Sequence, residues 1–176
     1  MRVPTGIMKI VQKHLHILGD RSNIDKWKDS TFEVVKKAPK TPQGDFGEYV
    51  TRDIIRSICK LEAERINEGK GDFDILVATI LEMEHKLATE DSNNMFQFNN
   101  IKKKAIYDYV FTLGVSPEHL WFNIWSKNYI VVNCTTHMSK NAGDSYKFSA
   151  TANPDGKHSL LPLTVKNLKK EVAKIV

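Results

Sequence analysis

The chain has 176 residues, 41% of them hydrophobic and 27% charged, with a formal net charge of +5 and a pI of about 9.1. This composition is that of an ordinary globular protein, and the length is sufficient for one domain with its own core. No apolar run is long enough to span a bilayer and no signal-peptide pattern is present, so we expect a cytoplasmic (intracellular) protein with no membrane partner. The two cysteines, Cys59 and Cys134, form no C-x-x-C pair and do not favour zinc.

The first elements expected along the chain are two helices. Residues 8–18 carry apolar side chains at helical spacing. Residues 40–44 contain Pro and Gly and are typical of a loop. Asp45 follows, with Glu48 three residues later as a capping box requires, and apolar residues then recur at steps of three and four. The pattern predicts a second helix over residues 45–67.

Two short strands joined by a tight bend are expected next. The first begins at Asp74 and the second covers residues 80–87. Because side chains alternate along a strand, Glu82, Glu84 and Lys86 share one face of the second strand. A hairpin could bring Asp74 onto the same side. The sequence therefore gathers two or three carboxylates and one ammonium group on a sheet.

This gathering of charge has a chemical interpretation and a plain one. Carboxylates crowded together repel unless a hard cation lies between them, and oxygen ligands suit Mg²⁺. With Asp74 and Glu84 as metal ligands, Lys86 could hold a nucleophilic water, which is the equipment for metal-assisted phosphodiester hydrolysis. The plain alternative is a solvated sheet face, where Glu and Lys commonly alternate. Whether Asp72 or Glu82 replaces or supplements the preferred acids stays open.

The remainder of the chain predicts a further mixture of helix and strand. We expect a helix from about 99 to 107, strands over 109–113, 130–132 and 146–152, and a last amphipathic helix over 165–176. This order predicts an α/β (α+β) fold, in which a central mixed β-sheet is flanked by helices. No domain boundary is evident, so we expect a single domain with an N-terminal helix and loop (1–43), a core (44–153) and a C-terminal helix (154–176).

Four strings of the sequence occur in a recognisable order. Residues 43–48 (QGDFGE) open a helix with an acid, and residues 84–89 (EHKLAT) carry a Glu-x-Lys motif. Residues 96–101 (FQFNNI) and 107–117 (YDYVFTLGVSP) follow. Over roughly 36–153, this order resembles the core of the PD-(D/E)xK nuclease superfamily, the fold of many type II restriction endonucleases. The ordered set is more specific than the D…E-x-K motif alone.

The resemblance implies a restriction-endonuclease-like core and a set of active-site residues. Asp74, Glu84 and Lys86 would be catalytic, and Asp74 and Glu84 would bind one or two Mg²⁺ ions, with Mn²⁺ as a substitute. Glu48 would be a further catalytic acid, at a second metal or in the water network. Its other interpretation is the helix cap described above. Where the family motif has proline before the aspartate, this chain has Phe73.

The activity implied by the resemblance is Mg²⁺-dependent hydrolysis of double-stranded DNA at a specific sequence, as by a type II restriction endonuclease. A restriction-modification system would add a cognate DNA methyltransferase as a functional partner. Because the chain is small, cutting both strands implies a homodimer that reads palindromic DNA. Two alternatives stay open, namely a repair or nicking nuclease of the same fold and a non-catalytic DNA-binding protein.

DNA contacts would come from polar residues outside the hairpin. Asn and Gln can read adenine edges, while Lys can reach guanine or phosphate. Each candidate has the alternative of a loop side chain in water. The aromatic residues over 121–125 are expected to pack in the core or a dimer interface, in preference to stacking on bases. The candidates for DNA contact are Asn94, Gln97, Asn99, Asn100, Lys103, His137, Lys140, Asn141 and Lys147.

Overall fold

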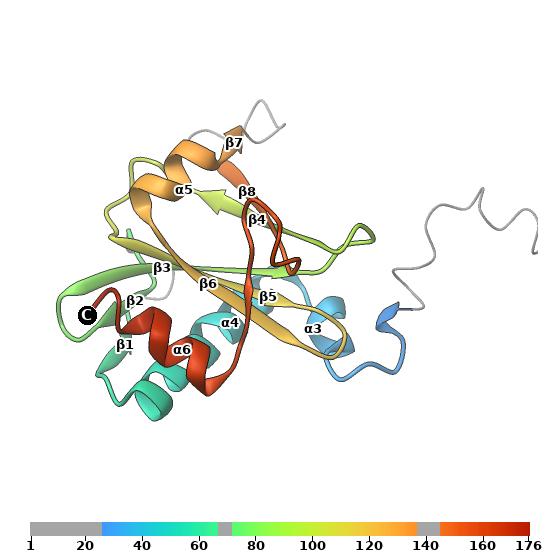
Figure 1. Ribbon diagram of the computed structural model, residues 1–176, viewed down its shortest axis with the longest axis horizontal. Helices are drawn as coiled ribbons and strands as arrows, with labels where there is room; N and C mark the ends of the chain where they lie inside the picture. Colours follow the sequence, from blue (N-terminus) through green and yellow to red (C-terminus); the bar gives the residue numbers. More distant parts are fainter. Residues whose placement is uncertain (1–25, 67–71, 137–144) are drawn as a thin grey trace, which may run out of the picture.

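Figure 1 shows the computed structural model, which describes residues 26–66, 72–136 and 145–176. The helix predicted over 8–18 lies outside the described residues. No helix in the described part of the chain is long and apolar enough to cross a membrane. The helical elements are α3 (Glu33–Lys37), α4 (Lys40–Ile54), the π-helical segment η2 (Ile55–Cys59), α5 (Lys127–Asn133) and α6 (Val165–Val172).

The described residues form two sheets, and the larger one is mixed. Its six strands lie in the order β1-β2-β3-β5-β6-β9, with β3 and β5 parallel and the other neighbours antiparallel. The smaller sheet is antiparallel, in the order β4-β8-β7. The predicted α+β fold with a central mixed sheet and flanking helices is confirmed. The strands are β1 (Ala63–Arg65), β2 (Ile75–Val77), β3 (Leu81–Thr89), β4 (Met95–Ile101), β5 (Tyr109–Val115), β6 (Leu120–Ser126), β7 (Thr135–Thr136), β8 (Tyr146–Thr151) and β9 (Leu161–Pro162).

The large sheet lies between two different layers (Figure 1). Helices α4 and α6 cover one face, and the small sheet with α5 covers the other. Each side has its own apolar cluster. Met83 of β3 packs with Leu168 of α6 in the first cluster, and Val110 of β5 packs with Phe98 and Phe148 of the small sheet in the second. Successive residues of a strand therefore face either the helices or the small sheet.

The predicted hairpin is confirmed. Ile75 of β2 is paired with Met83 of β3 in an antiparallel register. The bend between the strands places Ala78 and Thr79 at φ values of 50° and 63°, the left-handed conformation of turns that match the twist of paired strands. Three other predicted elements are confirmed in type and place, namely the strands over 109–113 and 146–152 and the helix over 165–176.

The helix predicted over 45–67 differs at both ends. α4 begins at Lys40, so the loop predicted before Asp45 is helical. Pro42 is compatible with this, because the first turn of a helix has no intrahelical partner for the N–H that proline lacks. Asp45 is consequently inside the helix and does not cap it. At the other end, Lys60 adopts a left-handed φ of 60° after η2, and the chain enters β1, a strand that the sequence did not predict.

The helix predicted over 99–107 is wrong. Residues 99–101 are the end of β4, and residues 102–108 form neither helix nor strand. Earlier in β4, Phe96 and Phe98 are buried and Gln97 between them is exposed. This is the two-residue period of a half-buried strand. A shift in register follows Phe98, and Asn100 has a φ of 62°. The bulge breaks the alternation, which is why the sequence pattern was ambiguous.

The strand predicted over 130–132 is also wrong, because these residues lie in α5. Ser126 caps this helix, and its side-chain oxygen accepts a hydrogen bond from the Tyr129 N–H. The β-branched residues that suggested a strand are accommodated on a short helix of which only Ile130 is buried. The preceding aromatic residues Phe122 and Trp125 are buried in strand β6, so their assignment to the core is confirmed.

The close approach of α4 to β3 depends on a glycine. A Cβ atom added to Gly47 would lie 2.3 Å from Cε1 of His85 and 3.1 Å from Cδ1 of Leu87. Both neighbours are side chains of β3, so any residue larger than glycine requires these side chains or the helix to shift. The contact matters for the site described below, because Glu48 is the next residue along the helix.

We predict that Gly47→Ala lowers the free energy of unfolding by about 1–3 kcal/mol, the usual effect of overpacking. Gly44→Ala in the same helix is the matched control, since a Cβ at Gly44 meets nothing within 4 Å. It should raise stability by up to about 1 kcal/mol through helix propensity. Urea denaturation followed by circular dichroism measures both values, and effects of equal sign would contradict the prediction.

Candidate active site

Three of the predicted catalytic residues lie together at the open end of the β2–β3 hairpin. Asp74 immediately precedes β2, and its backbone N–H donates to the carbonyl of Met83 at 3.1 Å. The Asp74 Oδ2 atom accepts the backbone N–H of His85 at 2.8 Å. Lys86, two residues beyond Glu84 on the same face, forms an ion pair with it. The fold therefore places Asp74, Glu84 and Lys86 next to one another.

Glu84 is a buried carboxylate, only 6% exposed. It is aligned with Val110 of β5, whose side chain belongs to the cluster beneath the small sheet. Burial raises the pKa of Glu84, the ammonium group of Lys86 opposes this rise, and the charge of Asp74 adds to it. Because a carboxylate removed from water is stabilised by a nearby cation, Lys86 is the residue that most strongly offsets the effect of burial on Glu84.

Glu48 approaches the same group from α4. Burial raises its pKa, the hydrogen bond from Arg65 opposes that rise, and the charge of Asp74 adds to it. The charge of Asp74 thus acts on Glu84 and on Glu48 at once. The three carboxylates form one electrostatically coupled group, although Glu48 and the hairpin are separated by β1 in the sequence.

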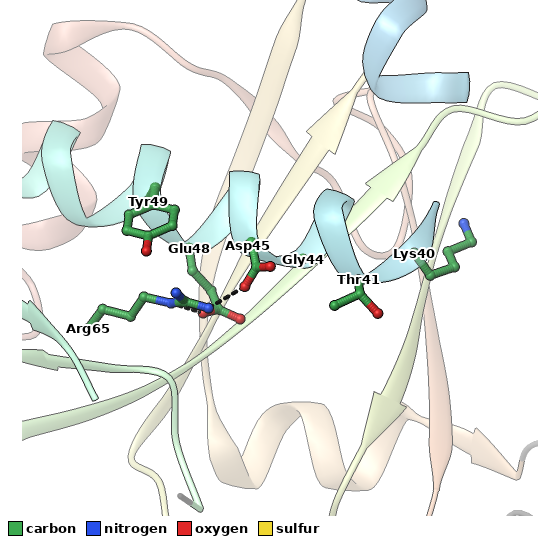
Figure 2. A pocket seen from close by; sticks show the side chains of 7 residues that line it. All are labelled: Lys40, Thr41, Gly44, Asp45, Glu48, Tyr49 and Arg65. Atoms are coloured by element: carbon green, nitrogen blue, oxygen red, sulfur yellow. Dashed lines mark hydrogen bonds and ion pairs between the residues drawn. The ribbon is translucent and has the colours of Figure 1, made fainter. Parts of the chain in front are cut away.

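Arg65 lies on β1, and its side chain contacts Glu48 on the neighbouring helix α4 (Figure 2). Its Nε donates to Oε2 of Glu48, and its Nη2 donates to Oδ1 of Asp45. The guanidinium carbon also lies 4.7 Å from the centroid of the Tyr49 ring. Asp45 and Glu48 therefore serve as partners of Arg65, not as the predicted capping box. Sequence reasoning missed Arg65, since partners 17 and 20 residues away leave no local pattern.

An open cavity of about 580 Å³ joins these residues to the small sheet. Three predicted catalytic residues and three predicted DNA contacts share its wall. A second cavity of about 520 Å³, the one drawn in Figure 2, lies on the Arg65 side of α4. Glu48 lines both cavities. The shared wall residues of the first are Glu48, Asp74, Lys86, Gln97, Asn99 and Asn100.

Of the other predicted DNA contacts, three that the structure describes do not line this cavity, namely Asn94, Lys103 and Lys147. Asn94, at a φ of 57°, accepts a hydrogen bond from Lys26 at 2.8 Å. The ammonium nitrogen of Lys103 lies 4.0 Å from the centroid of the Tyr146 ring. Lys147 is half-buried on β8. The last three candidates lie outside the described residues, namely His137, Lys140 and Asn141.

Asp72 and Glu82, the two acids whose assignment stayed open, lie away from the cavity. Neither Asp72 nor Glu82 lines the cavity. Asp72 is exposed. Glu82 shares the strand face of Glu84 but lies one step nearer the bend, where its backbone N–H donates to Asp108 at 3.0 Å. Asp74 lines the cavity, whereas Glu84 is buried behind the wall and is ion-paired with the wall residue Lys86. These contacts favour Asp74 and Glu84 over Asp72 and Glu82.

The chemistry of this donor set fits a hard divalent cation. Asp74 and Glu84 offer carboxylate oxygens. Burial is the main cause of the raised pKa of Glu84 and the charge of Asp74 adds to it, and a cation bound by both carboxylates would oppose both effects. Within the described ranges, no three His, Cys, Asp or Glu side chains come together as a metal-binding group. Glu48 therefore does not join the other two carboxylates in one cluster. Mg²⁺ commonly takes one or two carboxylates and fills its shell with water and phosphate oxygens.

Comparisons with known proteins give little further guidance. No protein-family model matches the sequence, and no curated protein matches it. Among solved structures, the chain is similar to that of a bacterial homing endonuclease, I-Ssp6803I. The TM-score is 0.47 and the identity 9%, over 78% of this chain and 97% of the other. A likeness of this degree does not assign a function to this chain.

His85 separates Glu84 from Lys86 in sequence but faces the helices. It is 4% exposed, and its ring centroid lies 6.2 Å from that of Phe111. Burial lowers the pKa of His85 to about 3, and the charge of Lys86 adds to this effect. Among the described residues its Nε2 has no hydrogen-bond partner. His85 is consequently a neutral packing residue that contacts α4 at Gly47.

We predict that His85→Gln changes how stability depends on pH. In the wild type, the unfolded chain binds a proton near pH 6.5 that the folded protein accepts only near pH 3. Stability is therefore lost on acidification through this window, by up to about 1.4 kcal/mol per pH unit. Glutamine does not titrate, so the stability of the wild type relative to the variant should fall as the pH decreases. Urea melts between pH 7 and pH 4.5 test this, and a constant difference would contradict it.

Proposed function

We propose that this chain is a Mg²⁺-dependent endonuclease that hydrolyses phosphodiester bonds of double-stranded DNA at a specific sequence, in the manner of a type II restriction endonuclease. The observation that supports the proposal is the placement of Asp74 and Lys86 on the wall of a cavity that polar residues of β4 also line, with Glu84 ion-paired to Lys86. A buried carboxylate–ammonium pair with a second carboxylate beside it has no packing advantage, and a hydrolytic site needs all three groups.

The roles of the residues follow from their contacts. Asp74 and Glu84 would hold the Mg²⁺, which when bound supplies Lewis-acid charge at the phosphate. Lys86 donates hydrogen bonds to the attacking water and to the scissile phosphate, where it stabilises the developing negative charge. Glu84 fixes the position of the Lys86 ammonium group through their ion pair. Glu48, on the opposite wall of the cavity, orients the water.

DNA recognition is assigned to the small sheet. Gln97 and Asn99 are exposed on β4, and the Gln97 amide nitrogen donates to Oδ1 of Asn99 at 3.0 Å. A two-stranded ribbon such as β4 with β8 has the width that the major groove admits, and its amide side chains can pair with adenine edges. Lys103 and Lys147 supply positive charge for phosphate oxygens. The net charge of +5 favours the same polyanionic partner.

Cleavage of both strands would require two active sites, so we propose a homodimer acting on palindromic DNA. A cytoplasmic location and a cognate DNA methyltransferase would follow from a role in restriction-modification. Supercoiled plasmid distinguishes the alternatives. Linear product fits the proposal, open-circular product fits a nicking or repair nuclease, and binding without any cleavage fits a non-catalytic DNA-binding protein.

We predict that Asp74→Asn and Lys86→Met each reduce Mg²⁺-dependent plasmid cleavage at least about 100-fold, because each removes a group that stabilises charge in the transition state. Asp72→Asn and Glu82→Gln are matched controls that change an acid outside the cavity and should keep activity within a few-fold. Circular dichroism checks that every variant is folded. Full activity in the Asp74 or Lys86 variant would refute the assignment.

A second prediction concerns recognition. Gln97→Ala and Asn99→Ala should each relax the preference at one base pair by about 1–3 kcal/mol, while Lys103→Ala should weaken binding to all sequences alike. Digestion of a large, defined DNA followed by sequencing of the fragment ends gives the preference of each variant. An unchanged preference in both amide variants would place recognition elsewhere in the chain.

A further inference from the structure

Glu48 already has a cationic partner within the protein. Arg65 donates to Glu48 and to Asp45, and the ring of Tyr49 covers the guanidinium group. The Arg65 side chain is only 14% exposed. Because an arginine cannot be deprotonated in a protein, this charge is present at every working pH. A permanently charged group on β1 thus binds Glu48 and favours its carboxylate form.

The charges of the group balance with one divalent cation. Four carboxylates, when ionised, face two cations, which leaves two negative charges. The other charged side chains on the two cavity walls are one lysine and one aspartate, and they cancel. A second Mg²⁺ would leave an excess of two positive charges. The carboxylates are those of Asp45, Glu48, Asp74 and Glu84, and the cations are Arg65 and Lys86.

The position of Glu48 agrees with this balance. It lies on the wall between the two cavities, with Arg65 in one and Asp74 in the other. Among the residues that the structure describes, Glu48 does not converge with Asp74 and Glu84 into a three-acid group. The electrostatic effect of Asp74 nevertheless reaches it. Glu48 is near the proposed metal ligands Asp74 and Glu84, but its carboxylate is bound by Arg65.

We propose that Arg65 is a positioning residue that stands in place of a second metal ion, holding Glu48 beside a one-metal site formed by Asp74 and Glu84. The inference rests on the proposed function, because it concerns the metal content of that site. In this arrangement Glu48 orients the attacking water and is not a ligand of the metal. Arginine suits this role, since its planar fork can bind two carboxylates at once.

The test counts Mn²⁺ bound per chain, measured from the electron paramagnetic resonance signal of the free ion with no DNA present. The wild type should bind one Mn²⁺ at this site, and Glu48→Gln should bind one with affinity changed less than about threefold. The Arg65→Met variant should bind two Mn²⁺ ions per chain, because it leaves the neighbouring carboxylates of Asp45 and Glu48 without their cation. The Arg65→Lys variant, which keeps a cation, should bind one. The double variant Arg65→Met, Glu48→Gln should also bind one, because the second site then lacks a ligand.

Arg52→Met is the matched control. The Arg52 guanidinium lies 5.1 Å from the centroid of the same Tyr49 ring, but it forms its ion pair with Asp53. This variant should bind one Mn²⁺, so that loss of an arginine beside Tyr49 is separated from loss of the partner of Glu48. Circular dichroism checks folding, and where Arg65→Met is unfolded the comparison of wild type with Glu48→Gln decides.

Two Mn²⁺ in the wild type, one of them lost in Glu48→Gln, would make Glu48 a metal ligand and overturn the inference while leaving the proposed function intact. A single Mn²⁺ in folded Arg65→Met would also overturn it. No Mn²⁺ binding by the wild type, together with no Mg²⁺-dependent cleavage of plasmid, would overturn the proposed function itself. The three failures are therefore distinguishable.

Discussion

The buried ion pair between Glu84 and Lys86 is the constraint on which the rest of the structure depends. It lies on β3, a strand bordered by β2 and β5 in the large sheet. Removing two charges from water costs several kcal/mol for each ion, and an apolar pair of similar volume is often more stable. The neighbouring Met83 shows what the same strand does where only packing matters, since it is fully buried among apolar residues. Packing alone does not account for a charged face on this strand, and the surrounding layers must accommodate it.

The two layers accommodate β3 in opposite ways. On the helical side, Gly47 lets α4 approach closely, and His85 is a buried, neutral residue that packs against it. The open cavity is lined by α4, β3 and β4 together, and its wall includes Glu48, Lys86 and Asn99. Electrostatic interactions are stronger where burial keeps water away, so the partly buried ion pairs beside this cavity are stronger than pairs on an open surface.

How much of this arrangement the sequence could predict depends on how local each signal is. The hairpin and the shared face of Glu84 and Lys86 follow from alternation over a few residues, and they were predicted. β4 was missed because the bulge at Asn100 interrupts its alternation. Arg65 was missed because β1 has three residues and continues a helical pattern without a break. Its role is defined by partners on another element, which no local pattern encodes.

The contrast between partners on one element and partners on different elements also applies to the cations beside Glu84 and Glu48. A carboxylate that must act at a charged site has to be ionised and oriented before its ligand arrives, since reorganisation during the reaction is costly. Lys86 does this for Glu84 from the same strand, two residues away. Glu48 lies on a helix with no cation of its own in contact, so the partner comes from β1. The strand β1 is paired with β2, and β2 begins directly after Asp74. The pairing of β1 with β2 therefore fixes the position of Arg65 relative to both Glu48 and Asp74.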